Sequence, residues 1–264
     1  MTVPNTWVLF YVHDKEELYD LDRLQAFFTR LSERNCSVAA ETEIISRAIW
    51  RQYLVNVPEA DLKREDGLPF AEALEPRVSE SLRERAYAYV ASREEQLTAS
   101  VRSIAQSSLV RGFEFSVTLA PLEGYILLSV EQERFFHANL EGLAKYRYWI
   151  RVIEETYACW HPLYAHEFTH SHALANPSWE QVRALNIPAL YNLNIYGSEL
   201  TRLMGRDRVQ DAPAWLVREL DGSGCLLVPV DPYGFNSPGT YTYESVAKYL
   251  GFPVSDQEEE SVDA

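Results

Sequence analysis

The residues most suited to chemistry in this chain lie in positions 157–172, which hold four of its six histidines. This stretch contains the string His166-Glu167-Phe168-Thr169-His170, the spacing of a zinc-protease motif. On a helix both imidazoles would share one face and could bind one Zn²⁺, while Glu167 would activate a bound water as general base. A third ligand would come from downstream, where Glu199 has a suitable separation. This interpretation makes the chain a zinc metallopeptidase that uses His166, His170 and Glu199 as ligands.

The same stretch also has the pattern of a strand. Aromatic and histidine side chains alternate with smaller or polar ones from Tyr164 onward, which is the period of a strand. In a strand, His166 and His170 would share one face with Glu167 on the other, so a protease site of this kind would not form. Prolines on both sides also leave a short window for a helix. We therefore predict structural or exposed histidines, with no catalytic residue and no metal cofactor, and keep the zinc enzyme as the alternative.

Composition limits the class of protein. A chain of 264 residues with 47% hydrophobic content can bury a substantial core, as one α+β domain or as two small lobes. We expect a single domain over residues 1–255, with lobes of about 1–130 and 131–255 as the alternative, followed by a disordered acidic tail at 256–264. Phosphate binding needs a basic face, so a net charge of −15 argues against a nucleic-acid partner and favours a basic protein partner.

The cysteines and the first residues bear on the compartment. The three cysteines, Cys36, Cys159 and Cys225, are far apart and form no C-x-x-C pair, as expected of buried free thiols in a reducing compartment. The apolar run at residues 7–12 is too short for a secretory signal or a membrane span. We expect a cytoplasmic protein without a membrane partner.

The first 160 residues predict alternating strands and helices. Residues 7–12 are β-branched and aromatic and predict a strand. An apolar stripe at i, i+3, i+4 and i+7 predicts a helix over about 21–34. Residues 36–57 fit either structure, and 58–76 have the charge and prolines of a surface loop. Further expected elements are a long helix at 76–106, a hairpin at 113–130 and a helix over about 135–160.

The remaining residues form a compact pattern of short elements. We expect a short helix at 179–185, a strand at 189–196, a helix at 197–205 ending at Gly205, and a last helix from Thr240 or Thr242 to Leu250. Residues 215–220 and 225–230 predict two strands around an Asp-Gly turn. The whole chain therefore predicts an α+β fold, with a mostly antiparallel sheet flanked by helices.

This last part resembles a known family. The runs that carry the resemblance are Leu-Tyr-Asn-Leu-Asn-Ile-Tyr-Gly-Ser-Glu-Leu at 190–200, Leu-Met-Gly-Arg-Asp-Arg at 203–208, Ala-Pro-Ala-Trp at 212–215, and the Asp-Gly turn before Leu-Leu-Val at 226–228. They look like the C-terminal half of the type VI secretion and polymorphic-toxin immunity proteins. Residues 161–164 also look like the Pro-x-Tyr-Gly element of that family, with Ala165 where glycine is usual and Ser198 where proline is common.

The resemblance covers roughly residues 146–252 and implies a function. It implies a non-enzymatic protein that binds and blocks a cognate toxin, and it also implies that the histidine stretch lies outside a helix. Such proteins share no catalytic residues, so no site residue is carried over to this chain.

Overall fold

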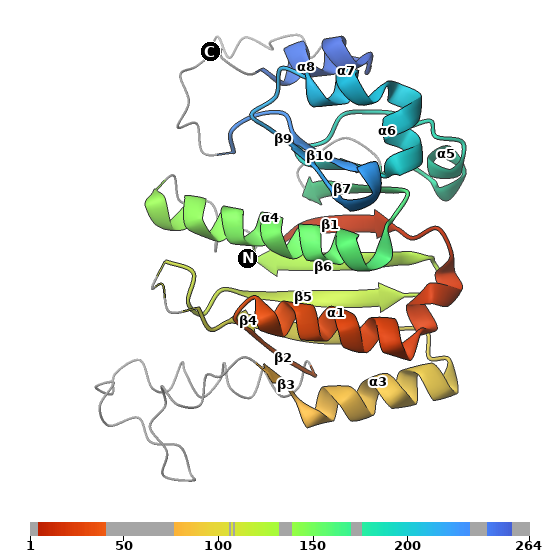
Figure 1. Ribbon diagram of the computed structural model, residues 1–264, viewed down its shortest axis with the longest axis vertical. Coiled ribbons are helices and arrows are strands. Elements are labelled where there is room, and N and C mark those ends of the chain that lie inside the picture. The colour runs from red at the N-terminus through yellow and green to blue at the C-terminus, as the bar shows by residue number, and fades with distance from the viewer. Residues whose placement is uncertain are drawn as a thin grey trace, which may run out of the picture.

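The fold is built on one long sheet. The computed structural model describes residues 5–40, 77–105, 107, 109–131, 139–169, 176–232 and 242–254. Within these residues ten strands form a single sheet in the order β3-β2-β4-β5-β6-β1-β7-β8-β10-β9 (Figure 1). Neighbouring strands are antiparallel except for β2 and β3, which are parallel. The predicted α+β fold, with a mostly antiparallel sheet flanked by helices, is confirmed.

The strands are β1 (Asn5–Tyr11), β2 (Cys36–Ala40), β3 (Arg77–Val78), β4 (Leu97–Ser103), β5 (Glu114–Ala120), β6 (Tyr125–Glu131), β7 (Tyr164–Thr169), β8 (Asn194–Tyr196), β9 (Leu216–Glu219) and β10 (Cys225–Val228). The α-helices are α1 (Leu21–Glu33), α3 (Glu80–Ser92), α4 (Leu140–Trp160), α5 (Trp179–Arg183), α6 (Ser198–Met204), α7 (Arg206–Gln210) and α8 (Tyr243–Leu250). Short 3-10 turns occupy Lys15–Tyr19 and Asp221–Ser223.

Strand β1 lies in the interior of the sheet, paired with β6 on one side and β7 on the other. Its side chains are apolar on both faces because both faces are covered. Val8 and Phe10 enter the core beneath α1 and α4, whereas Leu9 and Tyr11 enter a second core on the opposite face. Helices α5, α6, α7 and α8 cover that second core at the β7 to β9 end of the sheet (Figure 1).

Most elements match the sequence pattern. Helix α1, the β5–β6 hairpin and the β9–β10 pair lie where they were predicted, and α6 ends at Gly205 as expected. Residues 36–40, where the pattern fitted either structure, form β2. Of the expected strand at 189–196, only residues 194–196 form a strand, which is β8. The expected loop at 58–76, Thr240 and the tail at 256–264 lie outside the described residues. The predicted bound of the domain at residue 255 is likewise untested and remains a prediction.

One prediction was wrong. The expected helix over residues 76–106 is three elements, strand β3, helix α3 and strand β4. Arg93 adopts a left-handed backbone conformation with φ 50° and ends α3 after Ser92. Residues 97–103 then pair with β2 and β5, and the apolar side chains Leu97, Ala99 and Val101 are buried at every second position. Pairing on both sides of the strand outweighs the helical spacing that the apolar residues also fit.

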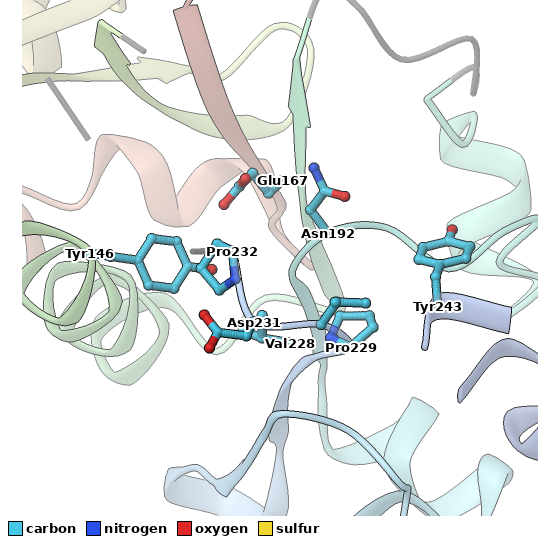
Figure 2. Close-up of a pocket in the computed structure, with 9 residues that line it drawn as sticks. Tyr146, Glu167, Asn192, Val228, Pro229, Asp231, Pro232 and Tyr243 are labelled. Carbon is cyan, nitrogen blue, oxygen red and sulfur yellow. The ribbon is translucent and has the colours of Figure 1, made fainter. Parts of the chain in front are cut away.

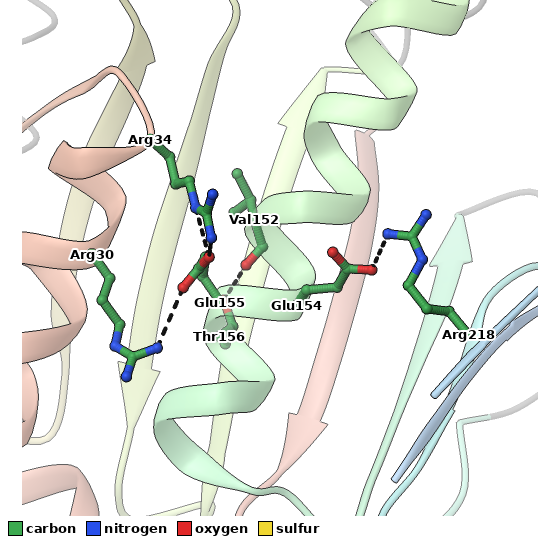
Figure 3. A network of polar contacts seen from close by, with 7 residues as sticks. All are labelled: Arg30, Arg34, Val152, Glu154, Glu155, Thr156 and Arg218. Carbon is green, nitrogen blue, oxygen red and sulfur yellow. Dashed lines mark hydrogen bonds and ion pairs between the residues drawn. The ribbon is translucent and has the colours of Figure 1, made fainter. Parts of the chain in front are cut away.

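Helix α4 is tied to elements on both sides of it (Figure 3). On one side the Glu155 carboxylate accepts a 2.6 Å hydrogen bond from Nε of Arg34 and lies 3.6 Å from the guanidinium of Arg30, both near the end of α1. On the other side Glu154 pairs with Arg218 of β9. Only 8% of Glu155 is exposed, so this carboxylate depends on its arginine partners for solvation.

The two ion pairs of α4 are expected to differ in strength. Glu155→Gln should lower the free energy of unfolding by about 1–2 kcal/mol. The neutral amide loses the charge-assisted hydrogen bond and the ion pair that the carboxylate forms with the two arginines. Glu154→Gln should cost less than about 0.5 kcal/mol, since that pair is more exposed. Urea denaturation of both variants measures the difference, and equal losses would contradict the greater weight given to Glu155.

Candidate functional site

Strand β7 divides the His-Glu string between the two faces of the sheet. Residues 164–169 are extended and pair with β1 and β8, which confirms the strand prediction and rules out a helix over this part of the string. His166 points into the core beneath α5 to α8, and Glu167 lies on the face that α4 covers. His170 lies outside the described residues, and Glu199 is exposed on α6. The helical arrangement on which the zinc interpretation depended is therefore not present at His166 and Glu167.

His166 is a fully buried histidine with a clear structural role. Its ring lies among the rings of Tyr11, Tyr164 and Tyr191, at centroid distances of 6.0, 5.5 and 4.3 Å. Its Nε2 forms a 2.9 Å hydrogen bond with Oδ1 of Asn176. Burial lowers the pKa of His166 to about 4, because the charged ring would lose its hydration, and the Asn176 hydrogen bond opposes this shift only in part. The imidazole is thus neutral at physiological pH and packs as an aromatic side chain.

Glu167 is the unusual member of the string. It is a carboxylate in the middle of an interior strand, and only 4% of the residue is exposed. Its backbone N–H donates to the carbonyl of Leu193 at 2.9 Å, but its Oε2 has no hydrogen-bond partner among the described residues. Burial raises the pKa of this carboxyl to about 7, since the charged form has lost most of its water.

A pocket of about 180 Å³ opens beside the Glu167 carboxylate (Figure 2). Its wall combines one residue of α4, one of β7, the residue two positions before β8, the end of β10 with the segment after it, and the start of α8. These lining residues are Tyr146, Glu167, Asn192, Val228, Pro229, Val230, Asp231, Pro232 and Tyr243. The described lining thus carries two carboxylates and no cationic side chain. We call it the Glu167 pocket.

Several of the pocket walls are fixed by contacts elsewhere. The buried Asn194 side chain accepts hydrogen bonds from the Tyr164 hydroxyl and the Tyr191 backbone N–H, at 3.0 and 3.1 Å. These bonds hold the turn that carries Asn192. The hydroxyl of Tyr243 donates to the Leu190 carbonyl. The Asn192 and Tyr243 sides of the pocket are therefore held in place, which lowers the entropy lost when a group enters it.

The chemistry of the Glu167 pocket is that of cation or donor binding. A buried carboxylate with a free oxygen attracts N–H donors and positive charge. Sequence reasoning considered Glu167 only as a catalytic base and did not single out Tyr146, Asn192 or Asp231. The one available signal was a carboxylate placed between aromatic residues in a run that otherwise has the pattern of a core strand.

The described residues show neither a metal cluster nor a membrane helix. Nowhere in the described ranges do three or more His, Cys, Asp or Glu side chains gather closely enough to hold a metal ion. Among the helices within those ranges, none has the length and apolar character needed to cross a bilayer. Cys36, Cys159 and Cys225 are all free thiols, in agreement with the absence of C-x-x-C pairing.

Comparison with known proteins places the chain in no family. No family model matches it, and no curated protein matches it. Among solved structures, the Pseudomonas aeruginosa T6SS protein PA0821 is similar over 94% of this chain and 75% of that chain, with a TM-score of 0.45 and 13% identity. At this TM-score and identity the similarity carries no argument about function.

Proposed function

We propose that this chain is a non-enzymatic, cytoplasmic binding protein of the immunity type, which binds a toxin partner and neutralises it without a metal cofactor. The supporting observation is that three separate sequence elements of the immunity-protein resemblance meet in the fold. The 161–164 element contacts both the 190–200 run and the Asp-Gly turn at 221–222, close to the C-terminal end of α4.

The contacts between these elements are close. The backbone N–H of Gly197 donates to the Leu163 carbonyl at 3.0 Å, which joins the 190–200 run to the 161–164 element. A Cβ on Gly197 would lie 2.5 Å from the carbonyl oxygen of Pro162. At the Asp-Gly turn, a Cβ on Gly222 would lie 3.8 Å from the ring of His161, and one on Gly224 would overlap the Tyr157 hydroxyl. Gly197 and Gly224 thus answer a packing requirement, whereas Gly222 allows the turn its φ of 67°.

Charge and the Glu167 pocket support a binding role. The net charge of −15 would attract a basic partner and repel nucleic acid. The pocket adds a concave feature with two carboxylates to this acidic protein. In contrast, the zinc alternative would need His166 and Glu167 to act on one ion, and they lie on opposite faces of β7.

The proposal is tested by expressing each gene that neighbours this one in the native genome, with and without this chain. We expect one neighbour to stop growth, this chain to restore it, and the two proteins to co-elute as a complex in size-exclusion chromatography. If none of the neighbours is toxic, or if the toxic one is not relieved by this chain, the immunity proposal fails.

Zinc content provides a second measurement. Elemental analysis of untagged protein, purified without chelator, should give far less than one zinc per chain, and a His170→Ala variant should give the same result. Near-stoichiometric zinc that disappears in the variant would contradict the proposal and would support the metallopeptidase instead.

A further inference from the structure

We propose that the Glu167 pocket binds the guanidinium group of an arginine side chain presented by the protein partner. The identity of the partner rests on the proposed function, whereas the preference for a guanidinium rests on the pocket alone.

The volume of the pocket suits a guanidinium. An apolar cavity of about 150 Å³ is enough to hold benzene. The Glu167 pocket measures about 180 Å³, so a flat group of four heavy atoms fits with part of its aliphatic stem. This wall of the pocket reaches the protein surface, because Val230 is exposed and Asp231 and Pro232 are half-buried.

The electrostatics of the pocket call for a cation with several donors. Glu167 Oε2 is buried without a hydrogen-bond partner among the described residues, an arrangement that costs free energy until a donor arrives. In Figure 2 its carboxylate faces the space between Tyr146, Pro232 and Asp231. A guanidinium there would donate to Glu167 and could also approach the Asp231 carboxylate near the opening. Charge-assisted hydrogen bonds of this kind are about twice as strong as neutral ones.

The walls of the pocket favour arginine over lysine. The Tyr146 ring and Pro232 line the same pocket as the carboxylate and offer apolar surfaces (Figure 2). Packing of Tyr146 against Trp215, at 6.1 Å between ring centroids, helps to hold that ring in place. A guanidinium stacks on aromatic faces and gives up its water more readily than an ammonium group does. The partner residue is therefore inferred to be an arginine that projects from its surface.

The chemistry of the pocket can be tested without the partner. Nuclear magnetic resonance titration of the full chain would use N-acetyl-arginine amide as the probe, with the lysine and citrulline analogues as comparisons. We expect saturable shifts at residues around the pocket with the arginine probe, weaker binding of the lysine probe, and no saturation with uncharged citrulline. Lysine binding as tight as arginine binding, or no saturation with arginine, would overturn the inference.

Variants locate the binding. Glu167→Gln should weaken binding of the arginine probe at least tenfold, and Asp231→Asn should weaken it by a smaller factor. Glu199→Gln, which removes one exposed carboxylate from α6, should leave it unchanged. Asp231→Asn keeps the inference testable if Glu167→Gln disturbs folding, because Asp231 is half-buried outside the strands. Unchanged affinity in a folded Glu167→Gln variant, or in Asp231→Asn, would overturn the proposal.

The partner, once captured, separates this inference from the proposed function. If the partner binds the wild type and the folded Glu167→Gln variant equally, the immunity function stands and the pocket inference fails. If the arginine probe binds at the pocket but no toxin is neutralised, the pocket inference stands and the proposed function fails.

Discussion

Replacing Gly197 by alanine is expected to lower the free energy of unfolding by about 3 kcal/mol. The backbone of Gly197 has φ −61°, which alanine adopts without strain, so the loss of stability comes only from steric overlap of the added methyl group. The added Cβ would lie 2.5 Å from the Pro162 carbonyl oxygen and 2.7 Å from that of Leu163. Both atoms belong to backbone, which cannot rotate away as a side chain would, and the bond from Gly197 N–H to Leu163 keeps them close.

Gly205 provides the matched control for this substitution. Its φ of 88° disfavours a side chain, but the nearest atom to an added Cβ is 3.6 Å away on Arg208. Gly205→Ala should therefore cost about 1–2 kcal/mol through backbone strain alone. Urea denaturation of both variants gives the comparison. A loss at Gly197 no larger than the loss at Gly205 would show that the β8–α6 junction can move away from residues 162–163, contrary to the close packing described above.

Neutralising Glu167 is expected to change how stability depends on pH. The folded-state pKa of Glu167 is raised from 4.5 to about 7, so folding favours its protonated form and stability is lost as pH rises through this interval. The pKa of His166 is lowered from 6.5 to about 4, so folding favours the neutral ring and stability is gained as pH rises from 4 to 6.5. Each shift corresponds to about 3 kcal/mol. The contributions of these two residues to the free energy of unfolding therefore oppose each other, and their sum hardly changes with pH between 4.5 and 6.5.

Single substitutions should reveal the two slopes. As pH rises from 4.5 to 7, the stability of Glu167→Gln relative to the wild type should increase by about 3 kcal/mol. The wild type loses this stability when its buried Glu167 carboxyl ionises, and the variant has no such group. By the same reasoning, His166→Phe should lose about 3 kcal/mol relative to the wild type between pH 4 and 6.5. Asp231 and Tyr146 line the same pocket as Glu167, and Tyr11, Tyr164 and Tyr191 surround His166. Burial raises the pKa of all three of these tyrosines, so they stay neutral over the range.

The measurement is chemical denaturation of wild type and variants at several pH values from 4 to 8. Differences from the wild type cancel the titration of the many other carboxylates. Glu199→Gln, which removes an exposed carboxylate from α6, is the control for the loss of one negative charge. Parallel curves for wild type and Glu167→Gln would show that Glu167 is solvated in the folded protein.

The sequence predicts the local elements of this protein better than its site. The apolar stripe of α1 and the alternation along β7 each depend on neighbours a few residues away, so the pattern is sufficient to predict them. Strand β4 was missed because its two partners, β2 and β5, decide its structure. The Glu167 pocket could not be predicted, since its wall comes from β7, α4 and the ends of β8 and β10, which only the strand order brings together.

The interior position of β1 has a consequence for how the chain reaches its native state. Tyr11 pairs with Tyr125 of β6 and with Tyr164 of β7, so both ladders of this strand close long loops. During synthesis β1 leaves the ribosome well before either partner exists, with apolar side chains on both faces and unpaired backbone groups. Folding dominated by such distant contacts is slow. Until β7 has emerged, the nascent chain is thus expected to expose the apolar faces and the edges of β1, which are prone to aggregation.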